Sequence, residues 1–561
     1  MRRAWLLLLV ATLAAAFAVA IGWTGGFDLR IAGARLRSHS WGRPAIAASL
    51  ALCLWLFTER GRIREMLRTA WLALDSSVAA HIVLAAALAW TIVAGSRFGT
   101  FSAGGSDSYG YLSQAHQLHA GRLSDDIPMH SAFTWSNAES TLIPLAHVRA
   151  PEPGRMVPTY PPGLPVLMAA VLPAGERAAY LLVPAFGAVL LFFTWRAGRL
   201  LGDSLAGAVA ALLLSLSPPF LLQLLQPMSD VPAAACWAAA IVWASRTGTR
   251  AALLAGISTG LAVMIRPNLG PLAVIVAASI VLTDEHRTRR AIAFFVPAAL
   301  LTGALLLIQA RRYGSPVGSG YGDPGDLFSI SNVGTNLRLY SGWITSRCTP
   351  VVWLFLAAPI ALTRARTLPL FWALAALIAG TWCAYLPYVS FRPEEWFYTR
   401  FLLPAIPFML LLATMVVMAG IRLLPREARP VLVTLFVLVM SLTLARGSRP
   451  SVAGIAAQEQ RYAAAGGFVR DSLPASSVVL AAQHSGSIRL YSNRVTVRWD
   501  LAAAGELDAI VAALRGGGFA PFVVLDAGEV PLFRERFAGQ RMLDRLRPLA
   551  EFGQARVYSV E

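Results

Sequence analysis

The stretch AALLAGISTGLAVMIRPNLGPLAVIVAASIVL, residues 251–282, decides the topology of this chain. It is almost entirely apolar, and only the tripeptide RPN (266–268) interrupts it. A proline inside a helix removes a backbone N–H and clashes with the preceding turn, so it ends or kinks the helix. We therefore predict two short helices, 251–265 and 269–283, with Arg266 between them. One long helix would instead reverse the orientation of every later segment.

The rest of the chain is as apolar as this stretch. Of its 561 residues, 56% are hydrophobic and 14% are charged, whereas soluble domains have about 25% charged residues. A helix of about 20 apolar residues crosses the hydrocarbon of a bilayer, and runs of this kind recur along the sequence. Because a helix satisfies its own backbone hydrogen bonds in lipid, the composition predicts a polytopic α-helical membrane protein.

We predict about thirteen membrane spans and three domains. The spans lie near residues 4–23, 44–57, 78–95, 178–195, 205–222, 231–245, 251–265, 269–283, 291–309, 351–363, 369–388, 401–419 and 430–445. The first is interpreted as an uncleaved anchor rather than a signal peptide, because the apolar run is long and no A-x-A site ends it cleanly. The domains are an N-terminal two-helix extension (1–77), a transmembrane core (78–445) and a soluble tail (446–561).

Arginine positions predict the orientation of these spans. The net charge of +18 would suggest nucleic-acid binding in a soluble protein, but we expect no nucleic-acid partner, since basic residues also mark cytoplasmic loops. With the N-terminus in the cytoplasm, arginine clusters fall inside at 60–68, 196–199, 246–250, 287–290, 364–366 and 422–429. Four segments then face the extracytoplasmic side: a large first loop (96–177), 310–350, 389–400 and the tail.

Two extracytoplasmic segments have recognisable local patterns. The basic segment FDLRIAGARLRSHSWGRP (27–44) is an exception to the charge rule, and its alternation of apolar and polar residues predicts a β-hairpin. In the tail, strand-like and helical patterns alternate, which predicts a small α/β domain with a parallel or mixed sheet. The strand patterns are at 476–483, 521–526 and 555–560, and the helical ones at 506–518 and 531–537.

The first loop contains GGSDSYGYLSQAHQLHAGRL (104–123), which has the pattern of an amphipathic helix at the membrane surface. Its early carboxylate, Asp107, has two interpretations. It caps the helix, or it lies at the wet edge of an apolar cavity. There, burial would raise the pKa of the carboxyl and make it a base for an acceptor hydroxyl or amine. Tyr109 and Tyr111, just after it, would flank a sugar ring.

Five other residues at the predicted outer face are candidates for substrate binding. Tyr160, in TYPPGLPVLMAA, is an interfacial anchor at a rigid turn or a wall for a sugar or isoprenoid. Asp230, in QPMSDVPAAACW, starts a helix before Pro232 as a cap or contacts substrate. His484, in QHSGSIRLYSN, is a packing residue or a functional one.

The remaining two candidates are arginines at the membrane edge. Arg266 is in IRPN, and Arg400 is in EEWFYTRFLLPAIP. Such arginines reach to lipid headgroups, or they hold a phosphate with several donors. Two of them on separate spans, facing one side, favour a phosphate site.

Nothing in the sequence indicates a metal or another cofactor. The four cysteines form no C-x-x-C pair, and the first loop has S-D-S where a D-x-D would bind a metal. H-E-x-x-H, Walker A and G-x-S-x-G motifs are also absent from the sequence. We therefore expect no metal site, no disulfide framework and no cofactor, although a divalent metal stays possible.

These segments, in this order, resemble the GT-C class of integral-membrane glycosyltransferases, in its bacterial branch related to protein O-mannosyltransferases and to the lipid A aminoarabinose transferase. The resemblance covers most of residues 78–445 and part of the tail. Its motifs are SDSYGYLSQAHQLHAGRL, YPPGLPVLMAA, QPMSDVPAAA, GISTGLAVMIRPN, YTRFLLPAIP and QHSGSIRLYSNR. Many members carry a second acidic residue beside the first-loop acid, where this chain has Ser106 and Ser108.

The resemblance implies an inverting glycosyltransferase that uses a polyprenyl-phosphate sugar, with Asp107 as its catalytic residue. The acceptor would be an envelope lipid, glycan or protein at the outer face of the bacterial cytoplasmic membrane. Two alternatives are a lipid or polysaccharide flippase and a non-catalytic envelope assembly protein. We detect no internal repeat of the kind that transporters have. A transporter also does not explain a large outer loop that carries an acidic residue, or a soluble tail.

Overall fold

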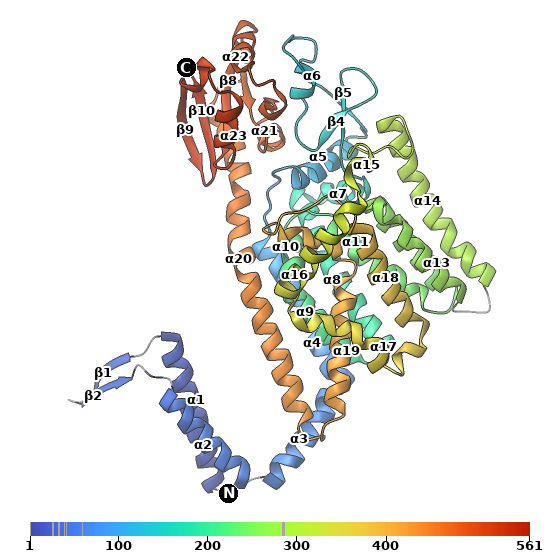
Figure 1. Cartoon of the computed structure of the whole chain (residues 1–561), viewed down its shortest axis with the longest axis vertical. Coiled ribbons are helices and arrows are strands. Elements are labelled where there is room, and N and C mark those ends of the chain that lie inside the picture. Colours follow the sequence, from blue (N-terminus) through green and yellow to red (C-terminus); the bar gives the residue numbers. More distant parts are fainter. Residues whose placement is uncertain are drawn as a thin grey trace. The chain divides into compact units, whose positions relative to one another are not determined.

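The computed structural model describes residues 2–24, 27–31, 34–38, 40, 42–58, 60–282 and 287–561. Most of these residues are helical (Figure 1). The chain divides into two compact units. The first contains Met1–Val78 with Gly420–Phe436, and the second contains Ala79–Ala419 with Val437–Glu561.

The first unit contains a helical pair and a hairpin. Its elements are α1 (Arg2–Thr24), β1 (Phe27–Ile31), β2 (Ala34–Ser38), α2 (Gly42–Thr58) and α3 (Arg60–Leu74). Strands β1 and β2 pair antiparallel, which confirms the predicted hairpin. Helices α1 and α2 pack side by side (Figure 1). Arg68 of α3 is ion-paired with Glu427 at 2.7 Å, which ties the 420–436 segment to this unit.

The second unit is built on a bundle of helices. These are α4 (Ser77–Phe98), α7 (Gly163–Val171), α8 (Glu176–Leu200), α9 (Ser204–Leu216), α10 (Pro218–Leu224), α11 (Asp230–Ala244), α12 (Thr249–Ile265), α13 (Ala273–Leu282), α14 (Arg287–Tyr313), α15 (Pro324–Leu327), α16 (Val333–Cys348), α17 (Ala358–Ala361), α18 (Pro369–Tyr385), α19 (Ile406–Arg422) and α20 (Arg429–Ser472). Short 3-10 segments join several of them: η1 (Leu172–Ala174), η2 (Pro267–Leu272), η3 (Ile330–Asn332), η4 (Pro350–Ala357), η5 (Ala365–Thr367) and η6 (Trp396–Leu402).

Every predicted span overlaps one or more helical segments, but few of these helices are long. Among the described residues, only α4, α8, α14 and α20 are long and apolar enough to cross a membrane alone. Three bent pairs raise the number to as many as seven: α9 with α10 (63°), η3–α16 with η4–α17 (112°), and η6 with α19 (83°). The remaining apolar helices have 10–17 residues. The number thirteen stays a prediction.

The break in the stretch that sets the topology is confirmed. Helix α12 ends at Ile265, η2 begins at Pro267, and α13 follows. Helix α12 packs closely on α14 because small residues face it. A Cβ atom on Gly256 would lie 2.2 Å from the Phe294 carbonyl oxygen, and one on Gly260 would lie 2.7 Å from Leu301. Such small residues let helix backbones approach within lipid.

The first loop folds over the bundle as a helix and a small sheet. Its elements are α5 (Asp107–His119), β3 (Asp125–Asp126), α6 (Ala138–Thr141), β4 (His147–Arg149) and β5 (Arg155–Pro158). The strands are antiparallel in the order β3-β5-β4. Helix α5 confirms the predicted helix, but its predicted polar face is not exposed, since Gln114 and Gln117 are buried.

Helix α20 leads into a five-stranded sheet at the C-terminus (Figure 1). The strand order is β7-β6-β8-β10-β9, with β6 parallel to β7 and β8, and β10 antiparallel to β8 and β9. The elements are β6 (Ser477–Leu480), α21 (Ser485–Ser492), β7 (Val495–Val497), η7 (Trp499–Leu501), α22 (Leu507–Gly516), β8 (Ala520–Asp526), α23 (Glu529–Arg536), η8 (Arg541–Leu543), β9 (Leu546–Phe552) and β10 (Ala555–Val560). The sheet is mixed, one of the two predicted arrangements, and the three predicted strands correspond to β6, β8 and β10.

The C-terminal sheet is packed against the first loop. Phe133 and Trp135 of the loop share one hydrophobic core with Val478, Leu480 and Val523 of the sheet. The predicted start of the tail, residue 446, falls inside the 44-residue helix α20. The tail therefore begins within a helix, and its sheet completes its core with side chains from the first loop.

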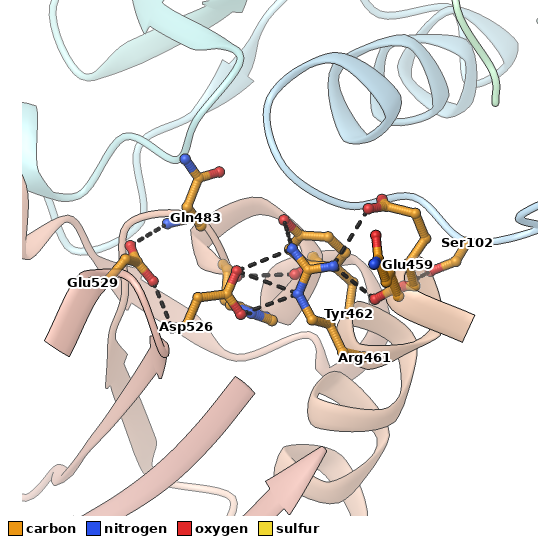
Figure 2. Close-up of polar contacts among 10 residues, drawn as sticks. Ser102, Glu459, Arg461, Tyr462, Gln483, Asp526 and Glu529 are labelled. Carbon is orange, nitrogen blue, oxygen red and sulfur yellow. Dashed lines mark hydrogen bonds and ion pairs between the residues drawn. The ribbon is translucent and has the colours of Figure 1, made fainter. Parts of the chain in front are cut away.

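A polar cluster joins α20, the sheet and the segment before α5 (Figure 2). Arg461 of α20 donates to both carboxylate oxygens of Asp526 at the end of β8. Ser102 donates to the backbone oxygen of Glu459, at 2.9 Å. A Cβ atom on Gly104 would lie 1.8 Å from the ring of Tyr462, so only glycine permits this contact. The cluster fixes the chain three residues before α5.

Candidate active site

One cavity collects most of the predicted site residues. Its volume is about 450 Å³, and it lies between α5, the turn before α7, the starts of α11 and η2, the end of α14, and η6. Six of the eight predicted residues line it: Asp107, Tyr111, Tyr160, Asp230, Arg266 and Arg400. Segments that are far apart in the sequence therefore meet at one place.

Asp107 is the first residue of α5, and its carboxylate faces an arginine. The N-cap residue is Ser106, which makes no side-chain cap hydrogen bond. Instead, the Ser106 hydroxyl is hydrogen-bonded to the Tyr160 hydroxyl at 2.7 Å. Arg400 Nη1 donates to Asp107 Oδ2, also at 2.7 Å. The Asp107 side chain is 27% exposed and that of Arg400 is 15% exposed. Asp107 is thus a cavity residue held by an ion pair.

The pKa of Asp107 departs from the expectation drawn from the sequence. Burial by itself would raise the pKa of this carboxyl. The Arg400 charge, hydrogen bonds from Tyr160 and Arg400, and the Arg266 charge outweigh burial and bring the pKa below its ordinary value. The expected rise was wrong for this state of the cavity, because a guanidinium far along the sequence is its direct neighbour.

Arg266 and Asp230 form a second ion pair in the same cavity. Arg266 Nη2 donates to Asp230 Oδ1 at 2.6 Å, and Nη1 donates to the Tyr385 hydroxyl at 3.0 Å. The Asp230 side chain is 1% exposed. Ser229, not Asp230, is the N-cap of α11. Arg266 is therefore held inside the protein by neighbours on two other helices.

Aromatic rings hold both arginines and form a wall of the cavity. Both guanidinium groups lie 5.2 Å from the ring centre of Phe401, at cation–π distance. The Tyr111 and Tyr160 rings lie 4.9 Å apart, and Tyr111 donates a hydrogen bond to Ser229. Phe401 was not among the predicted site residues. Its position next to Arg400 was the only available signal.

The end of α14 supplies a further cation, Arg312, which was not among the predicted site residues. Arg312 is 1% exposed and lines the cavity with Gln309. With its amide oriented to satisfy both ends, Gln114 donates to the Tyr160 carbonyl at 3.2 Å and accepts from Arg312 Nη2 at 3.1 Å. Arg312 therefore faces the cavity and helps to fix Tyr160.

Two predicted residues lie outside this cavity. Tyr109 packs near His147, with ring centres 5.7 Å apart, and lines a separate groove. His484 is fully buried in the tail, where Nε2 is hydrogen-bonded to Asp526 Oδ1 at 2.9 Å. Asp526 also binds Arg461 (Figure 2). Contact of Tyr109 or His484 with substrate stays a prediction. Neither residue lines the cavity that contains Asp107.

The acidic residues of the cavity face arginines rather than one another. Within the described part of the chain, no three His, Cys, Asp or Glu side chains gather closely enough to hold a metal ion. Asp107 and Asp230 are each neutralised by a guanidinium. That the protein has no metal site therefore stays a prediction from the sequence.

Solved structures of membrane glycosyltransferases share this architecture. ArnT from Cupriavidus metallidurans bound to undecaprenyl phosphate superimposes with a TM-score of 0.53 at 13% identity, covering 87% of this chain and 98% of that one. Its apo state gives 0.55 at 14%, with 86% and 97% covered. The Archaeoglobus fulgidus oligosaccharyltransferase, in complex with Zn and sulfate, gives 0.52 at 14%, with 85% and 73% covered.

The chain has the GT-C fold. Residues 160–311 match the dolichyl-phosphate-mannose-protein mannosyltransferase family, and this range includes Tyr160, Asp230 and Arg266. No curated protein sequence matches the chain. The family match and the GT-C fold together support a membrane glycosyltransferase.

Proposed function

We propose that this protein transfers a sugar from a polyprenyl-phosphate donor to an envelope lipid, glycan or protein. The observation that carries the proposal is the pair formed by Asp107 and Arg400 inside one cavity, with Arg266 beside it. A carboxylate suits the proton of an acceptor, and guanidinium groups suit a phosphate. The similarity to a GT-C protein that holds undecaprenyl phosphate supports this choice of donor.

In the proposed reaction the acceptor oxygen or nitrogen attacks the anomeric carbon of the sugar. The new bond forms as the bond from that carbon to the phosphate oxygen breaks, and the electron pair stays on the phosphate. Attack from the opposite face inverts the anomeric configuration. Asp107 takes the acceptor proton, which contributes about 10²–10⁴ in rate for a well-placed base.

The two arginines stabilise the leaving group in this proposal. Negative charge grows on the lipid phosphate as the bond breaks, and preorganised cations lower the free energy of that transition state. Arg266 and Arg400 are fixed on the ring of Phe401 and need little rearrangement. We assign the sugar ring to the Tyr111 and Tyr160 wall. The proposal assigns no step to a cofactor.

Donor binding would also activate the base. In the present state Arg400 lowers the pKa of Asp107, which makes the carboxylate a weaker base. A donor phosphate that takes over hydrogen bonds of Arg400 removes part of this effect, so burial then raises the pKa of Asp107. We therefore expect the donor to bind before the acceptor.

Transfer in detergent separates this proposal from a transporter. Purified protein, a labelled polyprenyl-phosphate sugar and an envelope extract are mixed without any sealed compartment, and products are identified by mass spectrometry. We expect a labelled envelope product with the wild type and at least a hundredfold less with Asp107→Asn. An unchanged donor with the wild type, or full activity of the variant, would contradict the proposal. Envelope glycans and lipids of a deletion strain would then identify the acceptor.

We further propose that the protein lies in the bacterial cytoplasmic membrane with its tail outside. The support is the arginine distribution, with Arg60–Arg68 and Arg422–Arg429 both in predicted cytoplasmic loops. A reporter that is active only in the cytoplasm, fused after Glu561, should be silent. A bright signal would contradict this orientation.

A further inference from the structure

A second cavity of about 510 Å³ opens between the first loop and the C-terminal sheet. Its lining comes from α5 and the segment after it on one side and from α21 to β7 on the other. It shares no lining residue with the cavity of Asp107. Helix α5 nevertheless belongs to both, since Asp107 begins it and Gln117, near its end, lines the second cavity. We call this second cavity the α5–α21 groove.

Gln117 lies in this groove with its hydrogen-bonding capacity unused. The residue is 2% exposed. Neither its amide nitrogen nor its amide oxygen has a partner among the described residues. Buried polar side chains are nearly always hydrogen-bonded, because desolvation without a bond is costly. A ligand hydroxyl both donates and accepts, so it would satisfy this amide.

The groove also holds two guanidinium groups that have no carboxylate partner in the described part of the chain. Arg489 donates to Thr496 Oγ1 at 2.9 Å and to the Leu142 carbonyl. Burial lowers the pKa of Arg489 to about 10. Arg494 donates to the Ser492 carbonyl at 3.4 Å, and its Nε is buried without a partner.

The other charges of the groove are already neutralised. Arg122 is paired with Asp125 at 2.6 Å, and Asp126 with Arg155 at 3.0 Å. The charge left over is therefore positive. This positive charge lies on the side of the groove formed by α21 and β7, at Arg489 and Arg494.

An aromatic ring completes the groove. Tyr109 lines it and packs on the backbone of α21, because a Cβ atom on Gly486 would lie 2.1 Å from this ring. Sugar rings commonly bind against aromatic faces, while amides and guanidinium groups bind their hydroxyl and acidic groups. The α5–α21 groove offers all three kinds of side chain: an aromatic ring, an amide and guanidinium groups.

We propose that the α5–α21 groove binds an anionic glycan, with its acidic group near Arg489 and Arg494 and its hydroxyls on Gln117. The role of the bound glycan rests on the proposed function: in a protein that transfers a sugar, this glycan is the acceptor. Helix α5 then carries the acceptor contact near its end and the base at its start. Tyr109, which has no place in the main cavity, would contact the acceptor here.

Equilibrium binding tests this assignment without relying on transfer. The probe is glucose 6-phosphate, compared with glucose and with inorganic phosphate, titrated into the full-length protein in detergent. We expect glucose 6-phosphate to bind at least tenfold more tightly than either comparison molecule. Gln117→Met and Arg494→Gln should each weaken it at least tenfold. Equal affinity for phosphate and glucose 6-phosphate would overturn the glycan assignment.

A control variant excludes a general charge effect. Arg541→Gln removes an exposed arginine of η8, between α23 and β9, that does not line the groove, and it should bind the probe normally. Unchanged probe binding in Arg494→Gln, or an equal loss of binding in Arg541→Gln, would overturn the proposal.

Stability separates a ligand contact from a structural role for Gln117. Methionine has a similar shape and no unsatisfied amide, so Gln117→Met should melt at the same temperature or higher. A lower melting temperature would show that Gln117 supports the fold instead. If the groove variants bind the probe normally and the wild type transfers sugar, the assignment of the groove is refuted and the proposed function stands. Groove-dependent binding in a wild type that transfers nothing would refute the proposed function alone.

Discussion

The carboxylate of Asp107 lies 2.7 Å from a guanidinium nitrogen of Arg400, although the two residues are 293 positions apart in the chain. The pair joins the start of α5 to η6, two segments that otherwise belong to the first loop and to the membrane bundle. It has a structural and a proposed chemical role, and substitutions separate the two.

Asp107→Asn should reduce both activity and stability. The loss of a general base lowers transfer by at least about a hundredfold. The loss of the ion pair leaves the Arg400 charge poorly solvated, which costs about 1–3 kcal/mol of unfolding free energy. Transfer rates and melting curves of the same preparations measure the two effects.

The double variant Asp107→Asn/Arg400→Gln is the control for this experiment. It removes both charges, so it should recover part of the lost stability, because no unpaired charge remains. It should not recover transfer. If the double variant transferred as fast as Arg400→Gln alone, Asp107 would serve only to hold Arg400, and its assignment as the base would be wrong.

Substitution of Arg266 by lysine should damage donor binding more than folding. Lysine keeps a positive charge beside Asp230, whose side chain is 1% exposed, but it lacks the planar fork that binds a phosphate with two donors. We expect a KM for the donor about tenfold higher, in line with a charge-assisted bond of about 1.5–3 kcal/mol. The melting temperature should stay near that of the wild type.

Arg266→Ala is the matched comparison for Arg266→Lys. It removes the charge as well, so Asp230 is left buried and unpaired, and such a loss costs about 3–5 kcal/mol. A normal donor KM in both variants would mean that the phosphate binds elsewhere. A wild-type melting temperature in Arg266→Ala would mean that the Asp230 pair adds nothing to the fold.

The cluster at Asp526 should make the tail sensitive to acid. Burial by itself would raise the pKa of this carboxyl, but hydrogen bonds from His484 and Arg461, and their charges, bring the pKa to about 2. The ordinary value is 3.8. The folded state therefore gains stability above pH 4 and loses it as the pH falls towards 2. The full effect is about 2 kcal/mol.

Thermal unfolding of the wild type and Asp526→Asn between pH 6 and 2.5 tests this linkage. The difference in melting temperature between them should be largest above pH 4 and should shrink towards pH 2.5. Asp471→Asn, at an exposed ion pair with Arg470, should follow the wild type at every pH. A difference for Asp526→Asn that does not change with pH would contradict the assignment.

Local patterns predicted the elements, whereas the contacts between them were beyond the sequence. Pro267 ends α12 where expected, and the alternation in the tail marks β6, β8 and β10. By contrast, no periodicity connects Asp107 with Arg400, so the pair and its effect on the pKa were not foreseen. Hydropathy also does not register bends. The predicted spans 205–222 and 401–419 cross the bends near Pro218 and Pro404, and the predicted span 351–363 omits the helix before the bend near Pro350.

Gly163 should be essential for the geometry of the main cavity. A Cβ atom at Gly163 would lie 2.4 Å from the backbone nitrogen of Ile265, so α7 starts directly against the end of α12. Arg266 follows Ile265, and Tyr160 precedes Gly163 in the same turn. This contact therefore sets the distance between one wall of the cavity and Arg266, the arginine that we propose binds the phosphate.

Gly163→Ala must push the two backbones apart, because neither has a flexible side chain that can move aside. A shift of about 1 Å in a reacting group can cost about a hundredfold in rate, and overpacking costs about 1–3 kcal/mol in stability. We expect transfer to fall at least tenfold. Gly270→Ala is the matched control, since Gly270 lies in η2, close to Arg266, with no atom within 4 Å of its Cβ position. It should transfer sugar and melt like the wild type. If Gly163→Ala behaved like Gly270→Ala, the close contact of α7 with α12 would not position the arginine, and the YPPG turn would be only a route back to the membrane.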